Sequence, residues 1–346
     1  MIQAKEYQGF IKETLEKIMS VDSPTGFSKA INETLNEIAN GLGYQAETTN
    51  KRLVKISVKG KSSDKKIAVS AHVDTLGAIV RSVTGDGKIR FSKLGGPILP
   101  TLDGEYCKVY ADGGKVYSGT ILCDSCSCHV YKDASTAERT ESNMYVRLDE
   151  EISCVLDVEK LGIRTGSIIA FDTKTTFTDS GFVKSRFLDD KAGSVCLLTV
   201  LSAMQKEKIQ PQYDVDFYFT NYEEVGHGAA TVGMDADELL AVDMGCVGLD
   251  LACKETQVSI CVKDGRGPYD YEIVERLISL AKENKIDYAT DVYPYYGSDV
   301  GAAWSAGANV KGGLIGPGVH ASHGMERTHL KGIYATIELL SAYLGL

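Results

Sequence analysis

The hydrophobic and polar positions in the first part of the chain follow a helical period and then a strand period. Residues 5–19 and 28–41 repeat apolar side chains every three or four positions, and the second run ends in "GLG", so we predict two helices. Residues 52–60 alternate between polar and apolar side chains, and residues 66–74, "KIAVSAHVD", are mostly apolar. We predict two strands there, the second of them buried.

The pattern changes after about residue 77. Residues 78–176 contain short β-like runs such as "KIRFSKL" and "KVYSGTI", separated by stretches rich in Gly, Asp and Thr. No long helical period occurs in this region. These features are typical of a small β-rich module, and we expect a barrel-like domain.

Helices and strands alternate again beyond this module. We predict helices at 191–205, 271–286 and 329–344, and strands at 213–221, 246–252 and 257–264. Because such elements lie on both sides of the β-rich segment, we expect one α/β domain, a mixed sheet flanked by helices. This catalytic domain would consist of residues 1–77 and 177–346, interrupted by an inserted domain at 78–176.

The composition narrows the classes of partner. The chain has 346 residues, more than one compact core usually holds, and a net charge of −10 without a Lys/Arg-rich block. An acidic balance argues against nucleic acid or a membrane as a partner, and leaves metal binding open because carboxylates are metal ligands. Nine cysteines occur without an N-terminal export signal or an apolar membrane span, so we expect free thiols in a cytoplasmic protein.

Residues that can bind metals or move protons fall at the ends of predicted strands and at the start of a helix. They are His72, Asp74, Asp189, Asp190, Glu223, Glu224, Asp243, His320, His323 and His329. Each has a structural alternative: Asp189 can cap a helix, for example, and a pair of glutamates can be surface charges. In α/β sheets, however, ligands collect at the carboxyl ends of the strands, so together these residues indicate one shared site.

The adjacent glutamates Glu223 and Glu224 follow the strand-like run "VDFYFTN", where like charges need a compensating positive charge. Two divalent metal ions that share one carboxylate fit this set, because zinc-like ions bind both imidazole nitrogen and carboxylate oxygen. One further carboxylate has to stay off the metals and accept the proton of the attacking water. We therefore expect one glutamate to bind metal and its neighbour to act as the base.

The motifs "AHVDTLG", "FLDDKAG", "EEVG", "VDMG", "GSDVGAAW" and "GPGVHASHGMERTH" occur in this order across essentially the whole chain. With them the chain resembles the dinuclear-metal aminopeptidases of the TET and glutamyl-aminopeptidase type, some of which are labelled endoglucanase-like. The resemblance implies a zinc-peptidase-like catalytic domain that removes N-terminal residues from short peptides. Attack would come from a metal-bridging hydroxide. Relatives commonly form dodecameric shells, so a homo-oligomer with subunit contacts through the β-rich insert is implied as well.

The resemblance implies five metal ligands: His72, Asp189, Glu224, Asp243 and His323. In this arrangement His72 and Asp243 bind one ion, Glu224 and His323 bind the other, and Asp189 bridges them. Two divalent ions per subunit are implied, with zinc or cobalt preferred and manganese as a further option.

The same resemblance implies roles for three further carboxylates. Glu223 would be the general base, and Asp74 would be the carboxylate that orients His72. The peptide bond between Asp189 and Asp190 would be cis. Sequence spacing alone leaves His320 and His323 open as ligands, and the resemblance favours His323.

Several positions depart from the commonest form of the family or have an open role. Lys191 stands where Arg is usual, Thr75 stands where Glu is frequent, and His227 follows "EEVG", where it would shape the substrate pocket. Asp299 either supports the site or caps a helix.

The run "CDSCSCH" contains Cys123, Cys126, Cys128 and His129, residue types that bind zinc. It lies inside the β-rich segment and lacks a second Cys/His pair at the distance typical of a zinc finger. We therefore favour free side chains there over a structural zinc site.

Two other kinds of function compete with an aminopeptidase. A dinuclear deacylase or carboxypeptidase would use the same metal chemistry but would need an Arg in its pocket for the substrate carboxylate. A non-catalytic assembly scaffold would not need a filled catalytic set. A glycosidase would need only a pair of carboxylates, so the two histidines argue against it.

Overall fold

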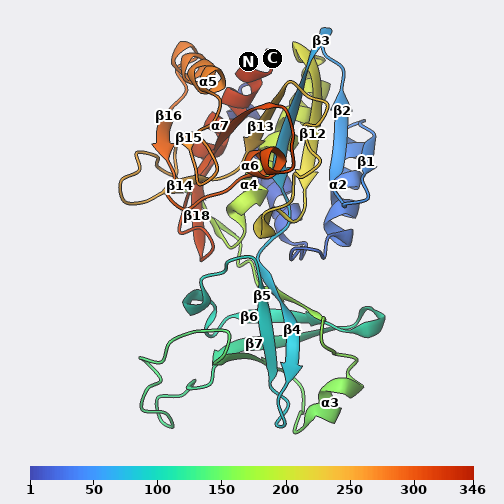
Figure 1. The fold of residues 1–346 in the computed structure, drawn as a ribbon, viewed down its shortest axis with the longest axis vertical. Helices are drawn as coiled ribbons and strands as arrows, with labels where there is room; N and C mark the ends of the chain where they lie inside the picture. Colours follow the sequence, from blue (N-terminus) through green and yellow to red (C-terminus); the bar gives the residue numbers. More distant parts are fainter. The chain divides into compact units, whose positions relative to one another are not determined.

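The structure is a computed structural model that describes residues 1–346, and these form two compact units. Unit 1 consists of Met1–Asp74 and Lys174–Leu346, and unit 2 consists of Thr75–Thr173 (Figure 1). A mixed sheet with helices forms the first unit and a closed barrel forms the second, which confirms the predicted fold class.

Unit 1 is built on a twelve-stranded mixed sheet. Its main path has the order β1-β2-β12-β3-β13-β17-β18-β11-β10, while β14 and β15 also pair with β17 and β16 pairs with β15. The strands are β1 (Ala46–Thr48), β2 (Val54–Val58), β3 (Ser62–His72), β10 (Thr176–Phe177), β11 (Phe182–Ser185), β12 (Tyr213–Thr220), β13 (Glu238–Val242), β14 (Gly245–Val247), β15 (Val258–Lys263), β16 (Tyr288–Val292), β17 (Lys311–His320) and β18 (Glu326–His329).

The helices of unit 1 cover this sheet. They are η1 (Ala4–Tyr7), α1 (Gln8–Met19), α2 (Lys29–Gly41), α4 (Leu188–Glu207), η4 (Glu223–Val225), α5 (Tyr271–Glu283), α6 (Asp299–Ser305) and α7 (Leu330–Tyr343). Helix α4 is buried along nearly its whole length, as its sequence "AGSVCLLTVL" requires, because a helix that is apolar on all sides is stable only in an interior. It packs on β3 and against α1 and α7.

Strand β17 lies in the middle of the sheet although its sequence, "KGGLIGPGVH", is rich in Gly and Pro. The glycines are needed because neighbouring backbone lies too close for a side chain. A Cβ atom on Gly316 would meet the carbonyl oxygen of Asp243 at 1.8 Å, and one on Gly318 would meet that of Lys254 at 2.2 Å. Glycine in a strand interior often marks such a close approach.

The prediction of a strand at 246–252 is mostly wrong. Only β14 forms there, and the chain then turns at 248–250. Leu249 is 99% exposed, which shows that the apolar run does not continue as a buried strand.

The chain ends of unit 1 lie side by side (Figure 1). The backbone N–H of Ile2 donates to Ser341 Oγ at 3.3 Å, which ties the first residues to the last helix. No helix in the structure has both the length and the hydropathy that a membrane crossing requires.

Unit 2 is a closed antiparallel barrel with the strand order β4-β5-β8-β7-β6-β9. The strands are β4 (Gly77–Val83), β5 (Ile89–Leu94), β6 (Tyr106–Tyr110), β7 (Val116–Cys123), β8 (Met144–Leu148) and β9 (Ile168–Phe171), and the connections carry η2 (Leu99–Leu102), η3 (Asp112–Gly114) and α3 (Val155–Lys160). Alternate strand residues such as Val80, Phe91 and Val146 fill the barrel, as the period of two requires.

Candidate active site

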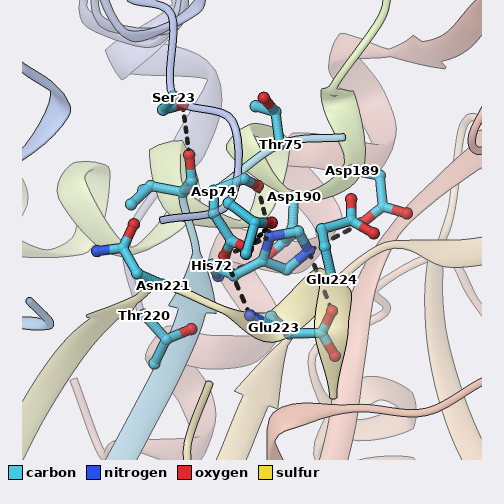
Figure 2. Close-up of polar contacts among 12 residues, drawn as sticks. Ser23, His72, Asp74, Thr75, Asp189, Asp190, Thr220, Asn221, Glu223 and Glu224 are labelled. Carbon is cyan, nitrogen blue, oxygen red and sulfur yellow. Dashed lines mark hydrogen bonds and ion pairs between the residues drawn. The ribbon is translucent and has the colours of Figure 1, made fainter. Parts of the chain in front are cut away.

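Three adjacent parallel strands bring the predicted site residues to one edge of the sheet. Strand β3 lies between β12 and β13, with His72 opposite Thr220 and Ser70 opposite Ala241. His72 is therefore level with the end of β12, from which the chain continues to the two glutamates, and with the end of β13, after which Asp243 follows. Figure 2 shows Asp189, Glu223 and Glu224 around the imidazole of His72.

His72 is buried and has polar partners on both ring nitrogens. Its Nδ1 lies 2.9 Å from the backbone oxygen of Asp74, and its Nε2 lies 3.0 Å from Asp189 Oδ1. Burial alone would lower its pKa, but the contact with Asp189 and the charges of Asp243 and Glu223 outweigh burial and raise the pKa well above its usual value. The Nε2 side of the ring therefore faces carboxylates, and these surroundings favour a bound proton or metal ion there.

Asp189 faces both predicted ligand histidines. Its Oδ1 is turned to His72, and its Oδ2 lies 3.5 Å from His323 Nε2. Burial opposes ionisation of this carboxyl, but the two histidines outweigh that effect and hold its pKa below the usual range. The same His323 nitrogen lies 3.6 Å from Glu224 Oε2.

These separations fit residues that bind common metal ions. Two ligand atoms about 2.1 Å from one ion, at angles of roughly 90–110°, lie about 3.0–3.4 Å apart. The spacings around Asp189 fall at or just above that range. In addition, one oxygen of Glu224, Oε1, is buried without a hydrogen-bond partner, which is costly unless a cation is bound there.

Asp243 belongs to the same cluster. Two groups of three residues each have ligand atoms within 4.8 Å of one another. The first group is His72, Asp190 and Asp243, and the second is His72, Asp189 and Glu224. Burial, followed by the charge of Asp189, raises the pKa of Asp243 to about 7. The cluster can therefore take up a metal ion in exchange for protons.

Asp190 has a different role from its neighbour. The peptide bond between Asp189 and Asp190 is cis, as expected from the family resemblance. Asp190 accepts hydrogen bonds from the backbone N–H groups of Gly193 at 3.1 Å and His72 at 3.2 Å. The cap-like contact at the start of α4 is therefore made by Asp190, and Asp189 is left to face the histidines.

Glu223 and Asp74 also lie near the His72 ring, Glu223 at Nε2 and Asp74 at Nδ1. Glu223 Oε2 is 3.9 Å from His72 Nε2, and the backbone N–H of Glu223 donates to Asp74 Oδ1 at 3.2 Å. The second oxygen of Asp74 accepts from the Thr25 hydroxyl at 2.7 Å. Burial raises the pKa of Glu223 well above its usual value, with the charges of Asp243 and Asp299 acting in the same direction.

The carboxylate of Asp74 is not the nearest partner of His72. Its Oδ1 lies 3.6 Å from His72 Nδ1, farther than the backbone oxygen of Asp74 itself. The imidazole is therefore oriented mainly by a carbonyl, and the Asp74 side chain holds the turn that begins at Glu223.

Glu326 was not identified from the sequence, although it stands three residues after His323 in the last motif. Its carboxylate accepts the backbone N–H of Asp189 at 3.0 Å and that of His323 at 2.9 Å. Burial and the charge of Asp189 raise its pKa to about 8. It links two segments that are far apart in sequence, which a sequence pattern does not reveal.

The other histidines are not part of the cluster. His320 is exposed at the end of β17. His329 accepts from the backbone N–H of Lys331 at 3.0 Å, and its other ring nitrogen lies 2.9 Å from the backbone oxygen of Ser180. His227 stacks on Tyr222, with ring centroids 5.2 Å apart, and does not line the pocket that the sequence predicted it would shape.

Asp299 makes no cap contact with its helix and instead contacts the last residue of β12. Its Oδ2 accepts from the Thr220 hydroxyl at 2.7 Å, while Oδ1 is buried without a partner. Lys191, which replaces the usual Arg, is also buried, and its Nζ donates to the carbonyl oxygens of Ile18 at 2.8 Å and Val21 at 2.9 Å. Burial lowers the pKa of Lys191 to about 7.

A pocket of about 240 Å³ opens onto the cluster. Its lining residues are Asp189, Glu223, Glu224, Gly226, Asp243, Arg266, Tyr295, Tyr296, Gly297, Ser298, Ala302 and His323. Arg266 was not identified from the sequence, since no motif surrounds it. The volume is below the roughly 300–1,000 Å³ of pockets for drug-sized ligands, so it suits one amino-acid residue.

The cysteine-rich run of unit 2 forms no comparable cluster. Cys123 is buried at the end of β7, while Cys126 and Cys128 are exposed and all nine cysteines have free thiols. These residues and His129 are not among the groups whose ligand atoms lie close enough together for a metal.

Comparison with known proteins identifies relatives of the chain. "Putative aminopeptidase YhfE" of Bacillus subtilis is 41% identical over 333 residues, 96% of this chain and 96% of that protein. "Lysyl aminopeptidase" of Pyrococcus furiosus is 22% identical over 238 residues, 67% of this chain and 66% of that protein.

Solved structures share the fold. The TET1 peptidase of Pyrococcus horikoshii, which can assemble into a tetrahedron or a large octahedral shell, superimposes with a TM-score of 0.84 at 21% identity. The match covers 96% of this chain and 99% of that one. The sequence model of one family, M42 glutamyl aminopeptidase, matches residues 54–339. On this match and the 41% identity over nearly the full length, the chain belongs to the M42 glutamyl aminopeptidase family.

Proposed function

We propose that the chain is a metal-dependent aminopeptidase that removes N-terminal residues from short peptides. The observation that carries the proposal is the position of Asp189, whose two oxygens lie 3.0 Å from His72 Nε2 and 3.5 Å from His323 Nε2. A carboxylate between two imidazoles is suited to bridge two divalent ions.

The five predicted ligands would hold the two ions as the family resemblance implies. His72 and Asp243 would bind one ion, Glu224 and His323 would bind the other, and Asp189 would bridge them. Bound ions would supply Lewis acidity toward the scissile carbonyl and toward the attacking water. Imidazole and carboxylate ligands suit zinc or cobalt, with manganese as a further option.

Glu223 would be the general base. Its carboxylate lies beside the cluster, and its backbone is fixed by Asp74 at 3.2 Å. Because burial raises its pKa, Glu223 binds a proton more readily than an exposed glutamate does. It would take a proton from the attacking water and pass it to the leaving amine, so that the peptide C–N bond breaks as the acid and the amine form.

The test combines a substrate panel with a substitution. Protein supplied with zinc, cobalt or manganese is assayed on aminoacyl-anilides, and Glu223→Gln is assayed with its metal content measured. We expect hydrolysis by the wild type and a loss of about 10²- to 10⁴-fold in kcat for the variant, with its metal retained. Full activity of Glu223→Gln with intact metal would remove Glu223 from the mechanism.

A deacylase or carboxypeptidase is the second candidate, and Arg266 is the observation in its favour. Such an enzyme needs a cation for the free carboxylate of its substrate, and Arg266 lines the pocket. N-acyl amino acids and C-terminally free peptides are the discriminating substrates. Hydrolysis of these but not of aminoacyl-anilides would favour the second candidate.

We also propose that copies of the chain assemble through unit 2. Apolar side chains on the surface of this unit support the proposal: Tyr106, Val116, Val130 and Leu156 are 46–72% exposed. The shells that the TET1 peptidase of Pyrococcus horikoshii can form lend further support, because that protein shares the fold. Sedimentation of the purified protein tests the proposal, and a monomer at micromolar concentration would contradict it.

A further inference from the structure

Three exposed apolar side chains stand next to residues that line the pocket of the candidate active site. Val225, Tyr295 and Met325 are 37–98% exposed, Tyr295 the most, and we call them the apolar rim. Tyr295 lines the pocket itself. Val225 directly follows Glu224 in η4, and Met325 comes two positions after His323. Both Glu224 and His323 line the pocket, so the rim is contributed by three segments around one site.

The backbone on both sides of Tyr295 is fixed. The backbone N–H of Tyr293 donates to the carbonyl oxygen of Lys263 at 2.8 Å. The Tyr296 hydroxyl donates to the carbonyl oxygen of Met244 at 3.1 Å, and the rings of Tyr293 and Tyr296 pack with centroids 5.0 Å apart. The ring of Tyr295, in contrast, is almost fully exposed. An aromatic side chain on a fixed turn loses little conformational entropy when it binds a ligand.

The segment that carries Met325 is fixed as well. The carbonyl oxygen of Gly324 accepts from Arg186 Nη1 at 3.3 Å. On the other side of Met325, the carboxylate of Glu326 accepts the backbone N–H of His323 at 2.9 Å. The exposure of Met325 is therefore maintained by anchored neighbours, and its flexible thioether side chain can adapt to ligands of different shape.

The size of the pocket indicates what covers the rim. A pocket of about 240 Å³ suits one amino-acid residue. When the N-terminal residue of a peptide fills it, the second residue lies only about 3.3–3.6 Å farther along the chain, at the mouth of the pocket. Tyr295 belongs to this mouth, because it lines the pocket and is exposed to solvent. The rest of the peptide therefore leaves the pocket past the rim.

We propose that the apolar rim binds the second residue of the substrate, beyond the scissile bond, and selects apolar side chains there. This inference rests on the proposed aminopeptidase function. An apolar side chain at this position removes apolar surface of the rim from water, which is favourable in proportion to the area buried. A glycine offers no side chain to the rim, and a polar side chain would lose water without gaining a hydrogen bond from it.

The experiment compares two dipeptide amides that share the N-terminal residue hydrolysed best in the anilide panel. The second residue is leucine in one amide and glycine in the other. We expect the metal-loaded wild type to prefer the leucine amide by about 5- to 30-fold in kcat/KM. In Tyr295→Ser this ratio should fall to about twofold or less. Because both substrates are assayed with the same preparation, the ratio is independent of the fraction of folded enzyme.

Tyr271→Ser is the matched control. Tyr271 is also an exposed tyrosine, at the start of α5, but it does not line the pocket, so this variant should keep the wild-type ratio. A wild type without preference for the leucine amide, or a Tyr295→Ser variant with the full preference, overturns the inference.

A second copy of the chain is the competing occupant of the rim. Sedimentation of Tyr295→Ser distinguishes the two occupants. A lost preference with unchanged sedimentation supports binding of the substrate, whereas smaller species with an unchanged preference assign the rim to assembly and overturn the inference.

A binding measurement separates this inference from the proposed function. Calorimetry with the metal-loaded Glu223→Gln protein should give tighter binding of the leucine amide than of the glycine amide, and adding Tyr295→Ser should remove the difference. Selective binding by a protein whose wild type hydrolyses neither amide supports the inference and overturns the proposed aminopeptidase function. Hydrolysis of both amides with equal kcat/KM and equal affinity does the reverse.

Discussion

Two groups of potential metal ligands differ in how the chain brings them together. In unit 1, His72, Asp189, Glu224, Asp243 and His323 come from five separate segments; we call them the strand-end cluster. In unit 2, Cys123, Cys126, Cys128 and His129 lie within seven consecutive residues; we call them the Cys/His run. The ligand atoms of the strand-end cluster lie close together, whereas those of the Cys/His run do not. Nearness in sequence is thus a weaker guide to a site than the positions of strand ends.

The reason lies in the backbone. Parallel strands β12, β3 and β13 end at one edge, so their last residues and the loops after them meet. The Cys/His run leaves β7 into turns that point side chains outward, and Cys126 has only a distant contact, 3.9 Å, from Sγ to the Tyr145 hydroxyl. Sheet edges therefore impose a convergence that a turn-rich loop does not.

Removing the carboxylate shared by both histidines should have the largest effect. In Asp189→Asn one anionic ligand of both proposed ions is lost, so we expect activity on a good anilide substrate to fall by about 10⁴-fold or more. Metal content by mass spectrometry should fall below two ions per chain.

Asp179→Asn is the matched control for this substitution. It removes the same charge from an exposed position ten residues earlier and should leave metal content and activity unchanged. An Asp189→Asn protein with two bound ions and wild-type activity would contradict the assigned cluster.

A smaller loss is expected at Glu326, which touches the cluster only through backbone groups. In Glu326→Gln one amide oxygen replaces the two carboxylate oxygens that accept from Asp189 and His323. We expect metal affinity to fall by about 10- to 100-fold, with activity restored by excess metal. Activity lost at saturating metal would instead give Glu326 a role in the reaction itself.

Chelated protein should become less stable as the pH rises. The pKa values of Asp243 and Glu326 are raised to about 7 and about 8, chiefly by burial, from 3.8 and 4.5. The folded protein keeps protons that the unfolded chain releases above about pH 4, and this stabilisation is lost as the pH rises through 7 to 8. His72, whose pKa is also raised, acts in the same direction, while Asp189 acts only below about pH 4. Lys191, whose pKa burial lowers to about 7, acts in the opposite direction above that pH, but it is one group against several.

Thermal unfolding checks this sign. We expect the Tm of the chelated protein to be lower at pH 8.5 than at pH 5.5 by roughly 2–5 °C. Added zinc should reduce the difference, because the ions replace the protons. A Tm that rises with pH in the chelated protein would contradict proton storage by Asp243 and Glu326.

The smallest effect is expected in unit 2. The triple substitution Cys126→Ser, Cys128→Ser and His129→Ala should change metal content and activity by less than about twofold, because these side chains are apart. The loss of one bound ion per chain in this variant would show that the Cys/His run binds metal after all.

The sequence predicted the long helices and strands β2, β3, β12 and β15, but not strand β17. Its Gly316 and Gly318 count against a strand by propensity, whereas in the structure they are required by the backbone of Asp243 and Lys254. Strand propensity is a property of a single residue type. The close approach of the β17 backbone to Asp243 and Lys254, in contrast, depends on segments that are distant in sequence.

The candidate site, like the sheet, was predicted in part, and the residues that were missed depend on contacts between distant segments. Motif order singled out the residues of the strand-end cluster, which lie close together, although their metal roles remain proposals. Glu326 and Arg266 were missed because each acts through segments remote in sequence: Glu326 through two backbone N–H groups, Arg266 through Ser305 and helix α6. Such partners become visible only when the fold is known.

The interruption of unit 1 by unit 2 bears on the order of folding during synthesis. Unit 2 is one continuous stretch, so it can close its barrel once residue 173 has left the ribosome. Strand β3, in contrast, needs β12 and β13 on either side, and both are made much later. The nascent protein therefore carries a finished barrel while the sheet of unit 1 is still open, and the strand-end cluster assembles only after β12 and β13 have been made.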